Sequence, residues 1–471
     1  MKTSTESAVN YRVPLIIMTS LFFMWGFITC MNDILIPYLK GIFELTHFKA
    51  MLVQFVFFGA YFIGSLIYFI YSALKGDPIN KIGYQNGLVA GLVISAIGCA
   101  LFFPAADFVS FPLFLSALFI LGLGFTLLQI CANPYVAILG TPESASGRLN
   151  LSQAFNSLGT TIAPIIGGYM IFKYFVGAEY TGADSVKIPY LIFATIFVLL
   201  AIFFKIIHLP VFTNQNEVSK GLVVLKHKPL RYGMGAIFMY VGAEVCIGSI
   251  LISYLKLKEI AGLDDNHAST FVAFYWGGLM IGRFIGGISL STFKNNTLKW
   301  TLILVSAITT TLLIMSIAHY KNGISFIEMS PYAGFVVLQI LGFILGRNKP
   351  ARTLLVFSIV IITLLLVTMT NIGVVAMWAV IAAGLFNSIM WSNIFTLAIK
   401  DLGEKTSQGS SLLIMMVVGG ALLPLFQGYL ADEIGIQMSF IVPLVGYAYI
   451  SFYSIWGYKN FPKNKGIIVS R

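Results

Sequence analysis

The stretch FMWGFITCMNDILIPYLK, residues 23–40, decides the fold, because a similar stretch, MYVGAEVCIGSILISYLK, follows at residues 239–256. When the two are aligned without gaps, eight of eighteen positions are identical. Each copy carries one acid in an apolar segment, Asp33 in the first and Glu244 in the second, at different positions of the alignment. The repeat predicts that one half of the chain has been duplicated and that each half keeps its own acid.

The composition indicates that most of the chain lies in lipid. Of 471 residues, 58% are hydrophobic and only 10% are charged, and the mean hydropathy is +0.89. Soluble domains carry about 25% charged residues, so a soluble fold is excluded. The net charge of +11 then indicates basic loops beside anionic lipid headgroups. All four cysteines lie in apolar segments without zinc-ligand spacing, so we expect neither a disulfide framework nor a metal site.

Fourteen apolar segments are long enough to cross roughly 30 Å of hydrocarbon. They lie at 14–39, 50–74, 84–106, 111–139, 149–172, 188–208, 232–255, 268–290, 298–318, 331–346, 353–370, 374–399, 410–430 and 438–458. With the N-terminus inside, 22 of the 29 Lys and Arg residues fall on the inner side and 7 on the outer side, as the positive-inside rule requires. If the pair 331–346 and 353–370 did not span, the split would weaken to 19 against 10. We therefore expect fourteen spans with both termini cytoplasmic.

A second internal similarity supports the duplication. GTTIAPIIGGYM (159–170) and GGALLPLFQGYL (419–430) share two glycines, a proline and a tyrosine. The longest polar connection, 205–231, separates the sixth segment from the seventh. Because six segments return the chain to the same side, the halves are expected to be parallel repeats, the pattern of major facilitator transporters.

We therefore expect an all-α polytopic membrane protein of the major facilitator fold with two six-helix pseudo-repeats. Two extra helices are expected between helices nine and ten. The predicted parts are an N-terminal lobe at 1–208, a cytoplasmic linker at 209–231, and a C-terminal lobe at 232–471 with the insertion at 320–372.

The two membrane acids are candidates for a cation-coupling site. A charge in hydrocarbon costs roughly 2.5–3.5 kcal/mol on insertion scales, and a desolvated carboxyl group is suited to carry a proton. Glu244 lies 13 residues after Arg231 and 12 before Lys256, which places it near the midplane. Asp33 lies roughly 10 Å below the outer surface by the same helical rise. No internal basic residue offers either acid an obvious partner; the alternative role is a hydrogen bond to a neighbouring helix.

Amide side chains and one tryptophan predict a sugar site. Amides both donate and accept hydrogen bonds, as sugar hydroxyls require, and the C–H face of a sugar packs on an indole ring. The predicted substrate-binding residues are Asn32, Gln129, Asn133, Gln153, Asn156, Asn387, Trp391 and Asn393. The alternative for each amide is an interhelical hydrogen bond, worth about 0.6 kcal/mol in membranes. Arg283, at the cytoplasmic end of the eighth segment, is predicted to be a gating or packing charge.

Five motifs carry a family resemblance. They are MNDILIPYLK (31–40), QICANPYV (129–136), RLNLSQAFNSLG (148–159), YVGAEVCIGS (240–249) and GLFNSIMWSNIFTLAIKDLG (384–403). In this order the chain resembles the fucose–galactose–glucose:proton symporter family of the major facilitator superfamily, apart from 320–372. The resemblance implies a twelve-helix two-lobed core, alternating access, and uptake of a hexose with a cation in the bacterial inner membrane.

The same resemblance implies roles for single residues. Asp33 matches the coupling Asp of fucose-transporting members, Asn156 matches a functional Asn, and Trp391 stands where they have a functional Tyr. Those members have Glu at the position of Gln129 and Gln at the position of Glu244. The resemblance thus implies that the second acid has moved from the fourth segment to the seventh, and it favours glucose or galactose over fucose. Sodium stays an alternative to the proton, because an acid with carbonyl and amide oxygens suits a hard cation.

We therefore predict a secondary active transporter, a cation-coupled hexose symporter, with no cofactor besides the co-transported H⁺ or Na⁺. The expected partners are a small sugar and the lipid bilayer, with no nucleic acid, and the protein is expected to be monomeric. A drug or metabolite exporter of the same superfamily is the main alternative, and its pocket should be more apolar. A membrane enzyme would need paired catalytic acids in a soluble-facing cleft, which the short loops do not offer.

Overall fold

The computed structural model describes residues 11–44, 47–169, 184, 186–212 and 221–459. Within these ranges, the side chains of 32–42, 47–51, 54 and 164–169 lie outside the description. The described residues form helices joined by short connections, which confirms the predicted all-α class.

The first half of the chain forms one lobe, the first lobe. Its helices are α1 (Arg12–Ile42), α2 (His47–Lys75), α3 (Pro78–Ala100), α4 (Phe102–Asp107), α5 (Phe111–Ile138), the 3₁₀ turn η1 (Pro142–Ser144), α6 (Ala145–Tyr169) and α7 (Lys187–Ile206). Asp77 begins α3 by accepting a hydrogen bond from the amide of Ile79 at 3.0 Å, and Pro78 fits the first helical position.

The second half forms the second lobe. Its elements are η5 (Val223–Lys226), α8 (Lys228–Leu255), α9 (Asp265–Ser289), α10 (Asn296–Asn322), α11 (Ser330–Gly346), α12 (Pro350–Thr370), α13 (Gly373–Asn387), α14 (Met390–Ile399), η6 (Gly403–Lys405), α15 (Thr406–Met415), η7 (Met416–Val418), α16 (Gly419–Ile434), η8 (Met438–Phe440), α17 (Ile441–Phe452) and η9 (Tyr453–Gly457). Helix α8 begins four residues before the predicted lobe boundary.

Among the described residues, twelve helices are long and apolar enough to cross a membrane. They cover twelve of the fourteen predicted segments, and α6 and α11 coincide with the other two. Helix α6 is more polar because it carries Asn150, Gln153 and Asn156. Helix α11 has only 17 residues.

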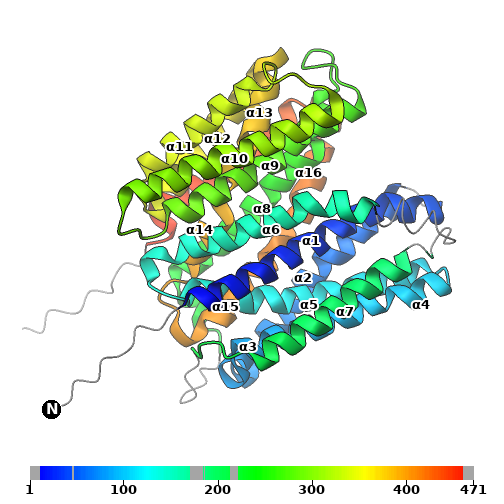
Figure 1. Ribbon diagram of the computed structural model, residues 1–471, viewed down its shortest axis with the longest axis vertical. Helices are drawn as coiled ribbons and strands as arrows, with labels where there is room; N and C mark the ends of the chain where they lie inside the picture. The colour runs from blue at the N-terminus through cyan, green and yellow to red at the C-terminus, as the bar shows by residue number, and fades with distance from the viewer. Residues whose placement is uncertain (1–10, 45–46, 170–183, 185, 213–220, 460–471) are drawn as a thin grey trace, which may run out of the picture.

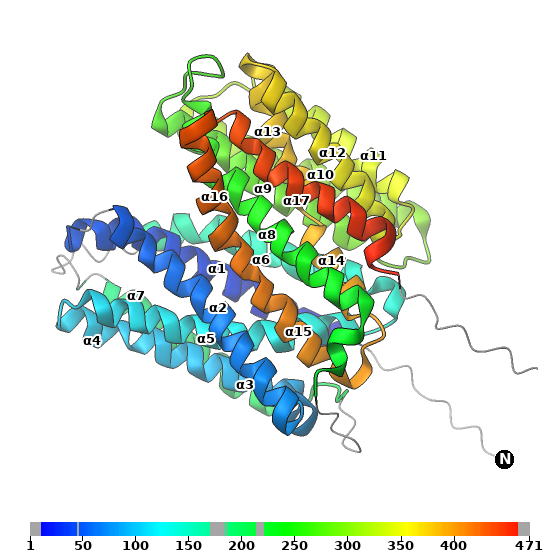
Figure 2. The same ribbon diagram turned by 180° about the vertical axis from the view of Figure 1, so that it is seen from behind.

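The two lobes lie side by side and meet most closely at one end (Figure 1). This end is called the terminal side here, because α1 begins there at Arg12 and η9 ends there at Gly457. From behind, the two lobes again diverge toward the opposite side (Figure 2). At the terminal side α6 and α9 approach so closely that a Cβ atom on Gly287 would lie 3.0 Å from Leu151 Cα.

The packing within the two lobes repeats. In the first lobe α1 packs on α6, α2 and α3 pack on α5, and α3 packs on α7. In the second lobe α8 packs on α16, α9 and α12 pack on α13, and α12 packs on α17. By this equivalence α12 is the counterpart of α3, and α10 and α11 are the added pair, packed on α9, α12 and α13. The sequence predicted the insertion at 320–372, which covers α11 and α12. The helix contacts instead identify α10 and α11, the two helices before α12, as the added pair.

Candidate substrate cavity and buried acid

A cavity of about 340 Å³ lies between the lobes. The first lobe contributes side chains from α1, α2, α5 and α6, and the second lobe contributes side chains from α8, α9, α14 and η7. The volume falls in the range of roughly 300–1,000 Å³ that is typical of small-molecule sites. Its polar lining residues are Thr29, Gln129, Gln153, Asn156, Glu244 and Arg283, and its aromatic lining residues are Trp25, Phe57, Phe58, Tyr61, Tyr240, Trp276 and Trp391.

Glu244 projects into this cavity from the middle of α8. Tyr240, one turn earlier on the same face, donates its hydroxyl to Glu244 Oε1 at 2.8 Å. The Nη2 atom of Arg283 lies 4.0 Å from the same oxygen, and both side chains are nearly buried. The expectation that no basic residue would partner Glu244 is therefore wrong, because α9 brings Arg283 to the acid.

Arg283 connects three helices. Its Nη1 donates to Ser157 Oγ of α6 at 2.5 Å, and its Nε donates to the carbonyl of Ser388 after α13 at 3.3 Å. The guanidinium therefore joins the first lobe to the second beside the acid. The sequence placed Arg283 at the end of its segment, and the structure adds that its side chain reaches the cavity.

A chain of hydrogen bonds supports Glu244 from behind. Tyr275 donates to the carbonyl of Glu244 at 2.9 Å, and Asn387 Nδ2 donates to the hydroxyl of Tyr275 at 2.8 Å. Tyr447 then donates to Asn387 Oδ1 at 2.7 Å. This arrangement fixes α8 against α9, α13 and α17 and occupies both ends of the Asn387 amide.

Of the predicted substrate-binding residues, Gln129, Gln153, Asn156 and Trp391 line the cavity. Asn156 donates through Nδ2 to the carbonyl of Phe22 at 3.0 Å, so its carbonyl oxygen remains to accept a bond from a ligand. The indole Nε1 of Trp391 and the hydroxyl of Thr29 are buried and have no hydrogen-bond partner within the described residues. Such groups are the ones that a polar ligand would satisfy.

Three predicted substrate-binding residues lie away from the cavity lining. Asn387 belongs to the chain behind Glu244, and Asn133 donates to the carbonyl of Gln129 at 3.2 Å. Asn393 accepts a bond from Asn150 Nδ2 of the first lobe at 3.2 Å. Asn32 and the predicted coupling residue Asp33 lie in α1, but their side chains are outside the described residues.

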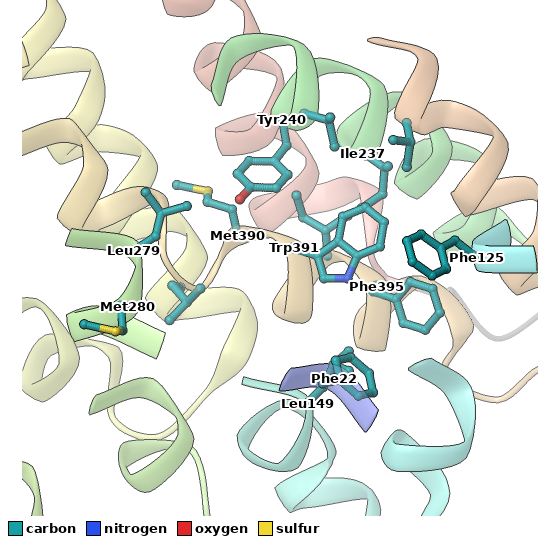
Figure 3. Close-up of a cluster of buried hydrophobic side chains, with 14 of the residues drawn as sticks. Phe22, Phe125, Leu149, Ile237, Tyr240, Leu279, Met280, Met390, Trp391 and Phe395 are labelled. Carbon is teal, nitrogen blue, oxygen red and sulfur yellow. The ribbon is translucent and has the colours of Figure 1, made fainter. Parts of the chain in front are cut away.

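An apolar cluster that includes the cavity residues Tyr240 and Trp391 lies beside the cavity (Figure 3). Trp391 and Phe395 are stacked, with ring centroids 6.0 Å apart and an interplanar angle of 23°. Phe22 and Leu149 of the first lobe and Ile237 of the second belong to the same cluster of buried hydrophobic side chains (Figure 3). All three lie closer to the terminal side than the lining residues of their own helices, so the cluster blocks passage in that direction.

Polar contacts between the lobes continue below this cluster. Besides the Asn150–Asn393 bond, Ser146 and Thr396 share a hydrogen bond of 2.5 Å. At the end of α2, Asp77 accepts bonds of 2.6 Å from both Tyr68 and Ser407, the latter on the second lobe. The structure is therefore closed at the terminal side.

Several cavity residues were not predicted from the sequence: Trp25, Thr29, Tyr61, Tyr240 and Trp276. Trp25 falls inside the repeated stretch, and Tyr240 stands one helical turn before Glu244. Thr29 also falls inside the repeated stretch, as a polar residue in an apolar segment, so these three positions were the available signals. The remaining aromatic residues could not be told apart from the many that pack in the core or face lipid.

Comparisons with known proteins agree with this architecture. The Major Facilitator Superfamily model matches residues 15–346. A glucose/galactose transporter of Brucella abortus is 43% identical over 98% of both chains. A putative glucose/galactose transporter of Helicobacter pylori is 38% identical over 94% of this chain and 96% of its own length. The crystal structure of the transporter FucP in its outward conformation superposes with a TM-score of 0.73 at 27% identity, covering 96% of this chain and all of that one.

Proposed function

Because this chain belongs to the Major Facilitator Superfamily, we propose that it imports a hexose together with a proton by alternating access. The observation that carries this proposal is the cavity between the lobes, in which one buried acid stands among amides and indole rings. The relatives are sugar transporters, and this chain is a multi-pass membrane protein of the same kind. The terminal side is assigned to the cytoplasm of a bacterial inner membrane, because most basic residues lie at the connections on that side.

Glucose or galactose is the proposed substrate. The names of the relatives support this choice, and so does the chemistry of the lining. The unpartnered groups of Thr29 and Trp391 and the free oxygen of Asn156 offer donors and acceptors to hydroxyls. Trp25 and Trp276 supply flat apolar faces for the C–H side of a pyranose ring. An exporter of apolar compounds would leave these amides without partners, which opposes the alternative.

Glu244 is proposed to carry the coupling proton. In its ionised form the carboxylate is compensated by Arg283 and by the Tyr240 hydroxyl. When Glu244 takes up a proton, its electrostatic attraction to Arg283 is lost. The guanidinium is then held only by its hydrogen bonds to the Ser157 hydroxyl and the Ser388 carbonyl among the described contacts. Protonation of Glu244 therefore changes the interactions of Arg283, which joins the two lobes, and so links proton binding to the movement of the lobes. Asp33 is proposed as a second proton site on α1.

The proton is favoured over sodium at Glu244 by the position of Arg283. A sodium site needs several oxygen ligands around the ion. Here a permanent positive charge lies 4.0 Å from the acid, and it would repel a metal cation at the same place. A proton is bound covalently and only neutralises the acid, so it is compatible with this neighbour.

Uptake into proteoliposomes tests the proposal. Radiolabelled glucose, galactose, fucose and N-acetylglucosamine are offered under an imposed pH gradient and, separately, a sodium gradient. We expect glucose or galactose to accumulate under the pH gradient alone. Accumulation of no sugar under either gradient would contradict the proposal and favour an exporter.

A further inference from the structure

A second cavity, of about 310 Å³, lies at the terminal side between the two lobes. Its walls come from η1 of the first lobe, the connection between α9 and α10, the first turn of α10, and the turn between α11 and α12. The connection between α9 and α10 builds most of this cavity together with α10 and the turn after α11, and the cavity is separate from the substrate cavity.

A buried lysine lines the second cavity. Lys299 is 6% exposed, and its ammonium group donates to the Ser289 carbonyl at 2.6 Å and to Asn348 Oδ1 at 2.9 Å. An ammonium group has three N–H donors, and two are used by these bonds. A buried charge without an ionised partner is costly, and the structure records no carboxylate within ion-pair distance of Lys299 among the described residues. The remaining donor and the uncompensated charge are suited to an anion.

The other walls present further donors. The first-turn amides of α10 point toward the helix N-terminus, and the Asn295 side chain accepts a bond from the amide of Leu298 at 3.1 Å. The amide of the lining residue Asn296 has no recorded acceptor among the described residues and is therefore available to a ligand. Ser291 and Thr292 add hydroxyl groups to the wall. Glu143 of the first lobe is the one acid in the lining of this cavity, and Arg148 lies close enough to interact with its charge.

From these contacts we propose that the second cavity binds a phosphate group, carried by a soluble phosphate ester or by a phospholipid headgroup. Lys299 and the first turn of α10 hold the anion, and Glu143 faces it from the other lobe. Because the donors and Glu143 belong to different lobes, movement of the lobes changes the repulsion on the bound anion. Binding and lobe closure are therefore linked reciprocally.

Thermal unfolding in detergent tests the soluble source. Inorganic phosphate is titrated against chloride at equal ionic strength, and we expect a saturable rise in melting temperature. Lys299→Gln should raise the phosphate concentration at half-saturation about tenfold or more, as expected for loss of a hydrogen bond from a charged group. Glu143→Gln should strengthen binding several-fold. Lys294→Gln, an exposed lysine next to the lining, is the matched control and should leave binding unchanged.

Native mass spectrometry tests the lipid source by counting phosphatidylglycerol molecules retained by each variant, with phosphatidylcholine as the comparison. Retention that depends on Lys299, without a response to inorganic phosphate, would assign the site to a headgroup. If Lys299→Gln does not fold, Asn296→Asp, at an exposed position of the same wall, should weaken either ligand. Equal responses of Lys299→Gln and Lys294→Gln, or no binding in both assays, would overturn the proposal. Neither assay depends on sugar transport.

Discussion

Arg283 of the second lobe donates a hydrogen bond to Ser157 of the first lobe at 2.5 Å. The same guanidinium lies 4.0 Å from the carboxylate of Glu244. A single cation thus touches both the proposed proton site and the interface that must open during transport. Changes at Arg283 or Glu244 are therefore expected to alter proton coupling.

Replacing Arg283 should uncouple the acid from the interface. A lysine cannot reproduce the planar fork that reaches Ser157 and the Ser388 carbonyl together. We expect Arg283→Lys to lower the initial rate of sugar uptake about tenfold or more, because one or two charged hydrogen bonds are lost. Arg352→Lys, at an exposed position on α12, is the control. Equal uptake by the two variants would contradict the role given to Arg283.

Glu244→Gln should abolish accumulation driven by a pH gradient while sugar exchange at equal concentrations continues. The neutral amide keeps a hydrogen bond from Tyr240 but cannot carry a proton. Counterflow and gradient-driven uptake in the same proteoliposomes separate these effects. Glu259→Gln, at an exposed position in the connection after α8, should behave as the wild type. Accumulation that persists in Glu244→Gln would transfer the coupling role to Asp33.

The Asn150–Asn393 bond should stabilise the state that is closed at the terminal side. Removing either amide leaves the other buried, and the two substitutions to Ala should not be additive. A double-mutant cycle on the melting temperature should give a coupling free energy of about 0.5–1.5 kcal/mol. Additive effects within error would mean that the bond contributes nothing to closure.

Asp77 should make stability depend on pH in the acid range. Burial raises its pKa above the ordinary value of 3.8, although the bonds from Ser407 and Tyr68 oppose this shift. The folded protein therefore holds this proton more tightly than the unfolded chain. The corresponding stability is present below about pH 3.8 and is lost as the pH rises through the raised pKa. The melting temperature of Asp77→Asn, relative to the wild type, should accordingly rise with pH above pH 4 and then level off.

The control for this measurement is Asp264→Asn. Hydrogen bonds from His267 hold the pKa of Asp264 below its ordinary value, so its titration lies under the tested range. The stability from Asp264 is present above about pH 3.8 and is lost as the pH falls through the lowered pKa. In the acid range the melting temperature of Asp264→Asn, relative to the wild type, should therefore fall slightly or stay flat as the pH rises. A flat difference for Asp77→Asn as well would show that burial does not control that group.

The added pair α10 and α11 should cross the membrane twice. Asn322, at the end of α10, and Asn348, between α11 and α12, are expected on opposite sides. Single cysteines at these two positions, in a protein without its four native cysteines, should react with an impermeant reagent from the periplasm and the cytoplasm respectively. Labelling of both from the same side would exclude two crossings.

Much of the fold could be predicted from the sequence, because lipid imposes a minimum apolar length on each span. The fourteen segments all correspond to helices, and the repeated stretch indicated the two lobes. The position of the added pair could not be predicted, since α10, α11 and α12 follow one another as three apolar helices. Only packing distinguishes them, with α12 alone occupying the place between α13 and α17.

Only part of the site could be predicted, because the sequence shows which residues are polar but not which way they face. A polar residue in a span is visible in the sequence, and so Gln129, Gln153, Asn156 and Glu244 were found. Whether such a residue meets the cavity or another helix depends on its angle around the helix axis. Asn387 and Asn393 face helices instead, and the contact of Arg283 with Glu244 depends on how α8 and α9 cross.

Because of helix α11, the second lobe fits the thickness of the bilayer differently from the first lobe. Its 17 residues span about 25 Å at the usual helical rise, less than the roughly 30 Å of a typical hydrocarbon core. Either the bilayer beside α11 becomes thinner or residues flanking the helix enter the hydrocarbon core. Each costs fractions of a kcal/mol per ångström of mismatch. The first lobe has no counterpart of this hairpin among its described residues. Acyl-chain length in the surrounding membrane should therefore act on one half of the molecule more than on the other.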